Sequence, residues 1–262
     1  MKSAFPLVLA TVTALLMTIG AAQADDPPTP SSSTHPRNSL GLGLVSAPTP
    51  YLGADNQVLP IPLVELYYKR LYVQGIRAGF RVLGDDGLHL DLRVRWSFLE
   101  LDPEDSPLLE GMSPRKPTAL GGLALEWNRG KLQIAGSLLT DLLGRSDGLA
   151  GSFLTSWREQ LMDGRLTLIP SLGFAYQDTK TIDYYFGVTP NEATEERPAY
   201  RGTAAWNPTA RLLALFNITP RLSLVAQFAG QSLDNEIRNS PIVEDSWGYE
   251  AVLGLTYSLG SR

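Results

Sequence analysis

A strict alternation of apolar and polar side chains is the feature that most constrains the fold of this chain. It is clearest between Leu88 and Phe98, where the even-numbered residues are all apolar and the odd-numbered residues are charged or polar. Successive side chains of a β-strand point to opposite faces, so this segment would have one apolar face and one charged face. A helix would scatter the same residues around its axis. The pattern therefore predicts strands.

The alternation recurs in long segments, and long alternating strands are typical of an antiparallel transmembrane β-barrel. Strands of about ten residues cross a bilayer at a tilt, whereas strands of soluble domains average about five or six. The predicted strands span about 39–47, 58–68, 71–83, 87–99, 118–128, 131–141, 149–160, 165–178, 205–218, 221–233 and 247–259. These are eleven, yet a single-chain bacterial barrel has an even number. Either residues 100–117 contain a further strand, or residues 58–99 have been split into one strand too many. Twelve strands are expected, with ten as the alternative.

The connections between the predicted strands are short at one end and long at the other, which also fits a barrel. Short turns are expected at 69–70, 84–87, 128–130, 163–164 and 219–220. Longer polar segments lie at about 48–57, 100–117, 142–148, 179–203 and 234–246. Outer-membrane barrels have short periplasmic turns and longer outer loops. The predicted location is therefore the cell outer membrane.

The N-terminal region predicts export before folding. Residues 1–24 combine an early lysine, an uncharged apolar stretch and an Ala-Gln-Ala cleavage site, so they are expected to be a cleaved signal peptide. The proline- and serine-rich residues 25–37 are expected to form a flexible leader, and residues 38–262 to form the barrel. The absence of cysteine excludes disulfides and thiolate metal sites. A net charge of −5 without a basic cluster argues against nucleic acid as a partner.

Five segments in a fixed order resemble the MipA/OmpV family of outer-membrane proteins. They are residues 50–55 followed by 59–62, then 109–112, 140–145 with Gly148, 184–188 with 192–193, and 240–243. The resemblance implies a barrel in outer-membrane lipid. For one branch of the family it also implies a scaffold that brings a murein-cleaving lytic transglycosylase near a murein synthase. Other members are described as outer-membrane proteins, adhesins or antigens, and the family implies no catalytic residues.

Charged residues on the predicted inner face form the first group of candidate site residues. If neighbouring strands keep register, a lumen charge network is expected from Glu65, Arg77, Arg81, Asp91, Arg93, Arg95 and Glu126. A barrel of ten to twelve strands lies between side-chain-filled barrels and water-filled porins. The network is therefore interpreted either as a structural set of ion pairs, since buried charges need partners, or as the lining of a narrow solute path.

The family-like loop segments supply the second group of candidates. Loops on a rigid barrel are natural places for recognition. The candidates are Tyr51, Gly53, Asp55, Met112, Asp141, Tyr184, Tyr185 and Ser240. The alternative is that these residues fix turn geometry.

Catalysis, cofactors and metals are not expected. His89 and Asp91 share a face and could form part of a triad, but Ser97 lies roughly eight residues along the strand, too far for proton transfer. The acidic loop clusters lack the spacing of a calcium loop. The leading functional hypothesis is a non-enzymatic scaffold in murein turnover. A channel for small solutes and an adhesin that acts through the long loops, above all 179–203, are the alternatives.

Overall fold

The structure, a computed structural model, describes residues 38–54, 58–85 and 87–259. The predicted signal peptide, the predicted leader and Asp55 lie outside the described residues. In the part of the chain that is described, no helix is long and apolar enough to span a membrane.

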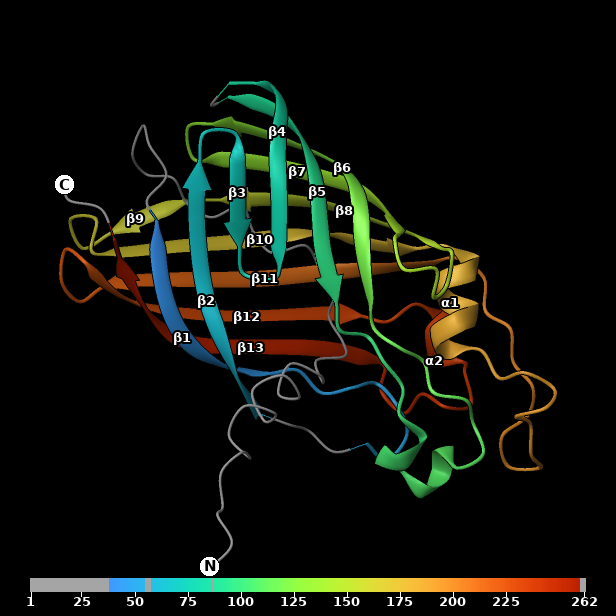
Figure 1. Ribbon diagram of the computed structural model, residues 1–262. Coiled ribbons are helices and arrows are strands. Elements are labelled where there is room, and N and C mark those ends of the chain that lie inside the picture. The colour runs from blue at the N-terminus through green and yellow to red at the C-terminus, as the bar shows by residue number, and fades with distance from the viewer. Residues whose placement is uncertain (1–37, 55–57, 86, 260–262) are drawn as a thin grey trace, which may run out of the picture.

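The strands form one antiparallel sheet that closes on itself (Figure 1). They are β1 (Ser39–Ser46), β2 (Val58–Tyr68), β3 (Leu71–Gln74), β4 (Arg77–Gly84), β5 (Leu88–Ser97), β6 (Thr118–Arg129), β7 (Leu132–Asp141), β8 (Leu149–Trp157), β9 (Glu159–Leu161), β10 (Leu166–Gln177), β11 (Ala205–Asn217), β12 (Leu222–Ser232) and β13 (Trp247–Ser258). Pairing of β1 with β13 and of β10 with β11 closes the ring. Because β8 and β9 both pair with β10, they are two parts of one strand. The predicted twelve-stranded barrel is confirmed.

The source of the odd strand count is a hairpin that both sequence-based explanations missed. Residues 71–83 were expected to be one strand, but they form β3, a tight turn at Gly75-Ile76, and β4. Gly75 has a φ of 53°, which a glycine adopts without the steric cost that other residues meet. Residues 100–117 contain no strand and instead form two short 3-10 helices, η1 (Pro103–Asp105) and η2 (Pro107–Leu109).

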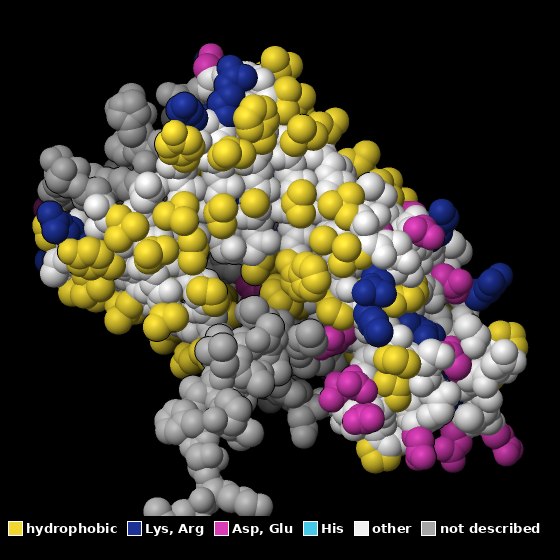
Figure 2. Space-filling model, viewed as in Figure 1, with side chains coloured by type: hydrophobic (Ala, Val, Ile, Leu, Met, Phe, Trp, Pro, Cys, Tyr) yellow, Lys and Arg dark blue, Asp and Glu magenta, His cyan; other side chains and the backbone are white. Residues whose placement is uncertain are grey.

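The outer face of the barrel is apolar and the inner face is polar. Exposed leucine, valine and aromatic side chains spread over the wall (Figure 2). Arginine, serine, threonine and glutamine side chains that alternate with them are buried on the inside. This arrangement reverses that of a soluble sandwich and suits a wall that contacts lipid. The barrel therefore spans the membrane.

The two ends of the barrel differ in their connections. Ser39 pairs with Ser258, so the described start and end of the chain lie together at the end that carries the short turns. The opposite end carries α1 (Thr179–Phe186), α2 (Asn235–Arg238) and the two 3-10 helices (Figure 1). Since outer-membrane barrels have short periplasmic turns, the end with the helices faces outward.

Four of the long outer connections pack together into a hydrophobic cluster, here named the cap. Its buried members are Tyr51, Leu99, Leu101, Leu109, Met112, Ile182, Tyr185, Phe186, Val188, Ala205, Leu233, Ile237, Ile242 and Val243. An isolated bridge between Tyr51 and Val243 joins two of these connections. Residues from distant parts of the sequence thus meet across the outer mouth of the barrel.

Candidate functional site

The register of β4, β5 and β6 brings the predicted charged residues together inside the barrel. Arg81 pairs with Asp91 across β4 and β5, and His89 pairs with Glu126 across β5 and β6. Because side chains two residues apart on a strand share a face, Arg93 also points into the lumen. Asp91, Arg93, His89 and Glu126 are all buried.

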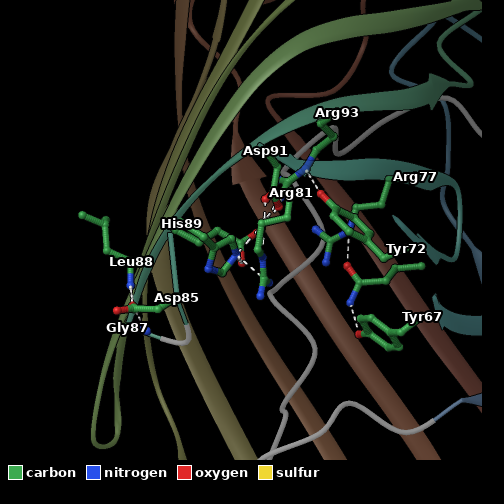
Figure 3. Close-up of polar contacts among 12 residues, drawn as sticks. Tyr67, Tyr72, Arg77, Arg81, Asp85, Gly87, Leu88, His89, Asp91 and Arg93 are labelled. Carbon is green, nitrogen blue, oxygen red and sulfur yellow. Dashed lines mark hydrogen bonds and ion pairs between the residues drawn. The ribbon is translucent and has the colours of Figure 1, made fainter. Parts of the chain in front are cut away.

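Arg93 and Glu126 form the central ion pair of this lumen network, and Figure 3 shows Arg93 close to Asp91 and Arg81. The Arg93 Nη2 donates to Glu126 Oε1, and the Arg93 Nε donates to the Tyr72 hydroxyl over 3.1 Å. Asp91 lies 3.8 Å from both Arg81 Nε and Arg93 Nη2. Two guanidiniums and two carboxylates therefore balance in charge, which offsets part of the cost of burying them.

His89 adds an imidazole to the same cluster. Its Nε2 lies 3.2 Å from Glu126 Oε2 and 3.3 Å from Arg81 Nη2. A guanidinium can only donate and a carboxylate only accept, so Nε2 serves one of them at a time. A protonated Nε2 donates to Glu126, whereas a bare Nε2 accepts from Arg81.

A second chain of contacts runs from β2 to β4. The Arg77 Nε donates to Gln74 Oε1 over 3.0 Å, and the Gln74 amide donates to the Tyr67 hydroxyl. Glu65 pairs in register with Gln74 and interacts electrostatically with Arg77. Arg95 pairs in register with Arg77 and is buried on the same inner face. All the residues predicted for the lumen network therefore lie on the inner face of β2, β4, β5 and β6.

The carboxylates and the imidazole of this network form a donor set that a metal could use. One ligand atom from each of His89, Asp91 and Glu126 lies within 4.8 Å of the others. One imidazole and two carboxylates suit Zn²⁺. Arg81 and Arg93 already neutralise both carboxylates, so a divalent cation would have to displace them. The sequence-based expectation of no metal stays a prediction.

The predicted loop candidates lie in the cap or at its edge, and most of them are buried. The Tyr51 hydroxyl donates to the Tyr185 carbonyl over 3.1 Å, and the Ser240 hydroxyl donates to the Phe186 carbonyl over 2.6 Å. Met112 is a buried member of the same cluster. The half-buried Tyr184 accepts a hydrogen bond from the Lys116 N–H over 3.0 Å. The structure assigns these side chains packing contacts, and a role in recognition stays a prediction.

Two loop candidates organise backbone turns. Asp141 accepts hydrogen bonds from the N–H groups of residues 143, 145, 146 and 147 and from the Thr118 hydroxyl. Gly53 has a φ of 69°, and a Cβ there would lie 2.7 Å from Ser106 Oγ. These contacts agree with the alternative that the family-like motifs fix turns.

Sequence reasoning missed a buried ion pair that holds the cap together. Arg115 donates to both carboxylate oxygens of Glu192, over 3.1 and 2.9 Å. Arg197 donates to the carbonyls of Leu108, Glu110 and Glu192. Glu192 and Arg197 are each only 6% exposed. A lone charge in a polar segment gives no sign of such a partner, because the partner comes from another loop.

Glu192 is held ionised despite its burial. Burial opposes ionisation, but hydrogen bonds from Arg115, from the Ser113 N–H and from Thr189 outweigh it and lower the pKa of Glu192 to about 2. Burial raises the pKa of Tyr51 and Tyr185 well above the ordinary value of 10.0, so both phenols stay neutral hydrogen-bond donors.

Two relatives in sequence and one solved structure illustrate what this chain is similar to. The Escherichia coli K12 protein named "Putative outer membrane protein YiaT" is 29% identical over 87% of this chain and 93% of its own. The Escherichia coli K12 protein named "MltA-interacting protein" is 26% identical over 84% of this chain and 89% of its own. An outer membrane channel from Pseudomonas putida F1 superposes with a TM-score of 0.47 at 10% identity, over 90% of this chain and all of that one.

A sequence profile covers almost the whole described barrel. The profile described as "MltA-interacting protein MipA" matches residues 40–259. The matched range begins in β1 and ends just after β13. With its relatives named as outer-membrane proteins, the barrel resides in the outer membrane. The chain therefore belongs to the MltA-interacting protein MipA family of outer-membrane β-barrels.

Proposed function

We propose that this protein is a non-enzymatic scaffold that holds a murein-cleaving lytic transglycosylase and a murein synthase at the outer membrane. The observation that carries the proposal is the cap, in which four outer connections pack together across the mouth of the barrel. Loops that pack across the mouth leave little room for solutes to diffuse through the lumen. What it presents to the periplasm is its set of short turns.

The periplasmic turns are rich in exposed basic side chains. These are Lys69, Arg70, Arg129, Lys131, Arg165 and Arg221. Acidic side chains gather instead at the outer end, around the loops that carry the helices (Figure 2). Such an asymmetry steers an acidic partner toward the periplasmic end. A relative bears the name MltA-interacting protein, which supports a murein enzyme as the partner.

A crosslinking pull-down from intact envelopes tests the scaffold. The tagged protein is expected to recover a lytic transglycosylase and a murein synthase. The double variant Arg129→Glu and Arg165→Glu should recover severalfold less of both. The matched control, Arg145→Glu with Arg201→Glu, reverses two exposed arginines at the outer end and should recover as much as the native protein.

The folded state of each variant is checked by the mobility of unheated barrel on a gel. Absence of murein enzymes from the pull-down of folded protein would contradict the scaffold. Equal recovery with the two double variants would contradict the role of the periplasmic turns.

A solute channel is the second candidate, and the buried charges of the lumen favour it. Arg93, Asp91 and Glu126 are charged residues buried on the inner wall. A barrel whose interior served only to be filled by side chains would not need charges at this position. An adhesin is less supported, since much of the 179–203 segment packs into the cap through Ile182, Tyr185 and Val188.

A further inference from the structure

The barrel wall has a gap, here named the notch, on the outer-end side of the short hairpin of β3 and β4. β2 has 11 residues, but β3 has only 4 and pairs with β2 at Glu65–Tyr68. The last contact between them is the hydrogen bond from the Gly75 N–H to the Val64 carbonyl. Beyond it, residues 58–63 of β2 pair with β1 on one side and, among the described residues, with no strand on the other.

The far side of the notch is the outer end of β5. β4 begins at Arg77, which pairs with Arg95, and the Trp96 N–H donates to the Ile76 carbonyl. From the β3–β4 turn toward the outer end, no strand lies between β2 and β5 among the described residues. Two missing strands correspond to a backbone separation of about 14 Å at ~4.8 Å per strand. A recess is visible just below the turn between β3 and β4, with an acidic side chain inside it (Figure 2).

The free edge of β2 is adapted to lie unpaired. The Val64 carbonyl points away from β1, so residues 60 and 62, at the same phase of the strand, direct their backbone groups into the notch. Both are prolines, which have no N–H to leave unsatisfied. An unpaired N–H facing lipid would cost several kcal/mol. The prolines also remove the donors that an added strand would need, which argues against docking of a partner strand.

The floor of the notch lies near the outer membrane interface. The 8 residues of β4 rise by about 20 Å at ~3.3 Å each and a tilt of ~40°, while the apolar band of such barrels is about 25 Å tall. Trp96 in β5 and Phe98 just after it flank the notch, with ring centroids 6.4 Å apart. Aromatic side chains mark the interface in outer-membrane barrels.

The inner side of the notch combines an apolar wall with two arginines. Leu59, Ile61 and Leu63 are the inward residues of the free part of β2 and are half-buried. Arg77 and Arg95 lie buried at the floor. Arg95 also lines a cavity of about 30 Å³ beneath the cap, whose other walls include residues of β8, β10 and β12.

We propose that the notch is a lateral binding site for the anionic headgroup of an outer-leaflet amphiphile, with Arg77 and Arg95 as the recognising residues. Guanidinium groups suit phosphate and carboxylate because they donate two parallel hydrogen bonds. The two guanidiniums bind the headgroup at the floor of the notch, while the acyl chain stays in the bilayer against the apolar edge of β2. The site is separate from the periplasmic turns, so it can fail without affecting the scaffold.

Site-specific fluorescence tests this proposal, because the chain has no native cysteine. A dye is attached at Ile76→Cys in the notch turn, or at Leu172→Cys on the lipid-facing wall of β10. The labelled barrel is placed in zwitterionic nanodiscs and titrated with spin-labelled lysophosphatidic acid. Quenching at position 76 should saturate at a lower probe fraction than at position 172. Equal quenching at the two positions would overturn the proposal.

Two further variants separate recognition from simple proximity. Arg77→Gln with Arg95→Gln should weaken the preference by about tenfold or more, whereas the exposed Arg201→Gln should not change it. Unchanged binding in the double variant would overturn the role of the arginines. Displacement of the probe by inorganic phosphate at similar concentration would also overturn the proposal, because it would assign the site to free phosphate.

A variant that fills the notch gives an independent measurement. Four residues are added to each of β3 and β4 at their shared turn, together with Pro60→Thr and Pro62→Thr to restore the donors. A folded barrel of this kind should lose the quenching difference between positions 76 and 172. If the difference persists in protein that shows native gel mobility without heating, the notch is not the binding site.

Discussion

The contacts of Glu126 show how single residues of the lumen depend on one another. Its carboxylate accepts from Arg93 and lies beside His89 Nε2, and its side chain is 11% exposed. The Arg93 side chain is 2% exposed. Loss of one member of a buried ion pair leaves the other charge uncompensated, and this costs far more than loss of an exposed pair.

Glu126→Gln is therefore expected to lower the free energy of unfolding by about 3–5 kcal/mol. Glu159→Gln is the matched control, because Glu159 pairs with Lys131 at the surface and should cost at most about 1 kcal/mol. Denaturant unfolding in detergent, followed by tryptophan fluorescence, measures both. A similar loss in the two variants would show that the lumen network adds little stability.

Glu192 predicts a pH dependence of the cap. Its pKa is lowered to about 2 from the ordinary value of 4.5, so its contribution to stability is complete above about pH 4.5 and is lost as the pH falls toward 2. A spin label at the exposed Glu195→Cys should become more mobile over this range. In the Glu192→Gln background the label should be mobile already at pH 7, and a transition that persists there would refute the assignment.

The β3–β4 hairpin is the element that makes this barrel asymmetric. Gly75 allows a turn after only four residues of β3, so β2 keeps a free edge within the outer half of the wall. The edge is tolerated because residues 60 and 62 carry no N–H. The turn and the prolines are separated in sequence but act on the same strand.

Pro60→Thr with Pro62→Thr is expected to make β2 a pairing edge. The restored donors face lipid unless another strand binds them, so the variant should either form dimers or lose several kcal/mol of stability. Crosslinking in detergent and unheated gel mobility measure the two outcomes. A monomer of native stability would show that the edge is satisfied in another way.

The whole molecule is a barrel with the cap at its outer mouth and charged residues within. In Figure 1 the helices and long loops gather at one end of the barrel, while the other end has short turns. The cap joins four loops through buried side chains and through the Arg115–Glu192 pair. Closure of the mouth thus depends on contacts between loops rather than on any one of them.

Planar-bilayer recordings are expected to show no steady conductance from the native protein. Replacement of residues 180–202 by a short glycine-serine linker removes Ile182, Tyr185 and Glu192 from the cap and should produce discrete steps. Steady conductance from native protein with an intact cap would favour the channel over the scaffold. No conductance from the loop-replaced barrel would show that the lumen network also blocks the path.

Much of this architecture follows from local sequence pattern. The two-residue alternation around Leu88–Phe98 determines the strands, their inner and outer faces and the buried arginines, because side-chain direction on a strand depends only on position. The same pattern placed Asp91, Arg93 and Glu126 on the inner face. The hairpin at Gly75 was missed although the phase of the alternation reverses there: the inward residues are Tyr72 and Gln74 before the turn and Arg77 and Arg81 after it.

The tertiary structure alone decided which inward and loop residues meet. Register between strands pairs His89 with Glu126 and Arg77 with Arg95, and register depends on the closure of the whole ring. Loop packing pairs Arg115 with Glu192 across a separation of 77 residues. The sequence by itself therefore determined the barrel and its two faces. The cap, the lumen pairs and the notch arise from contacts between distant segments, which no local pattern contains.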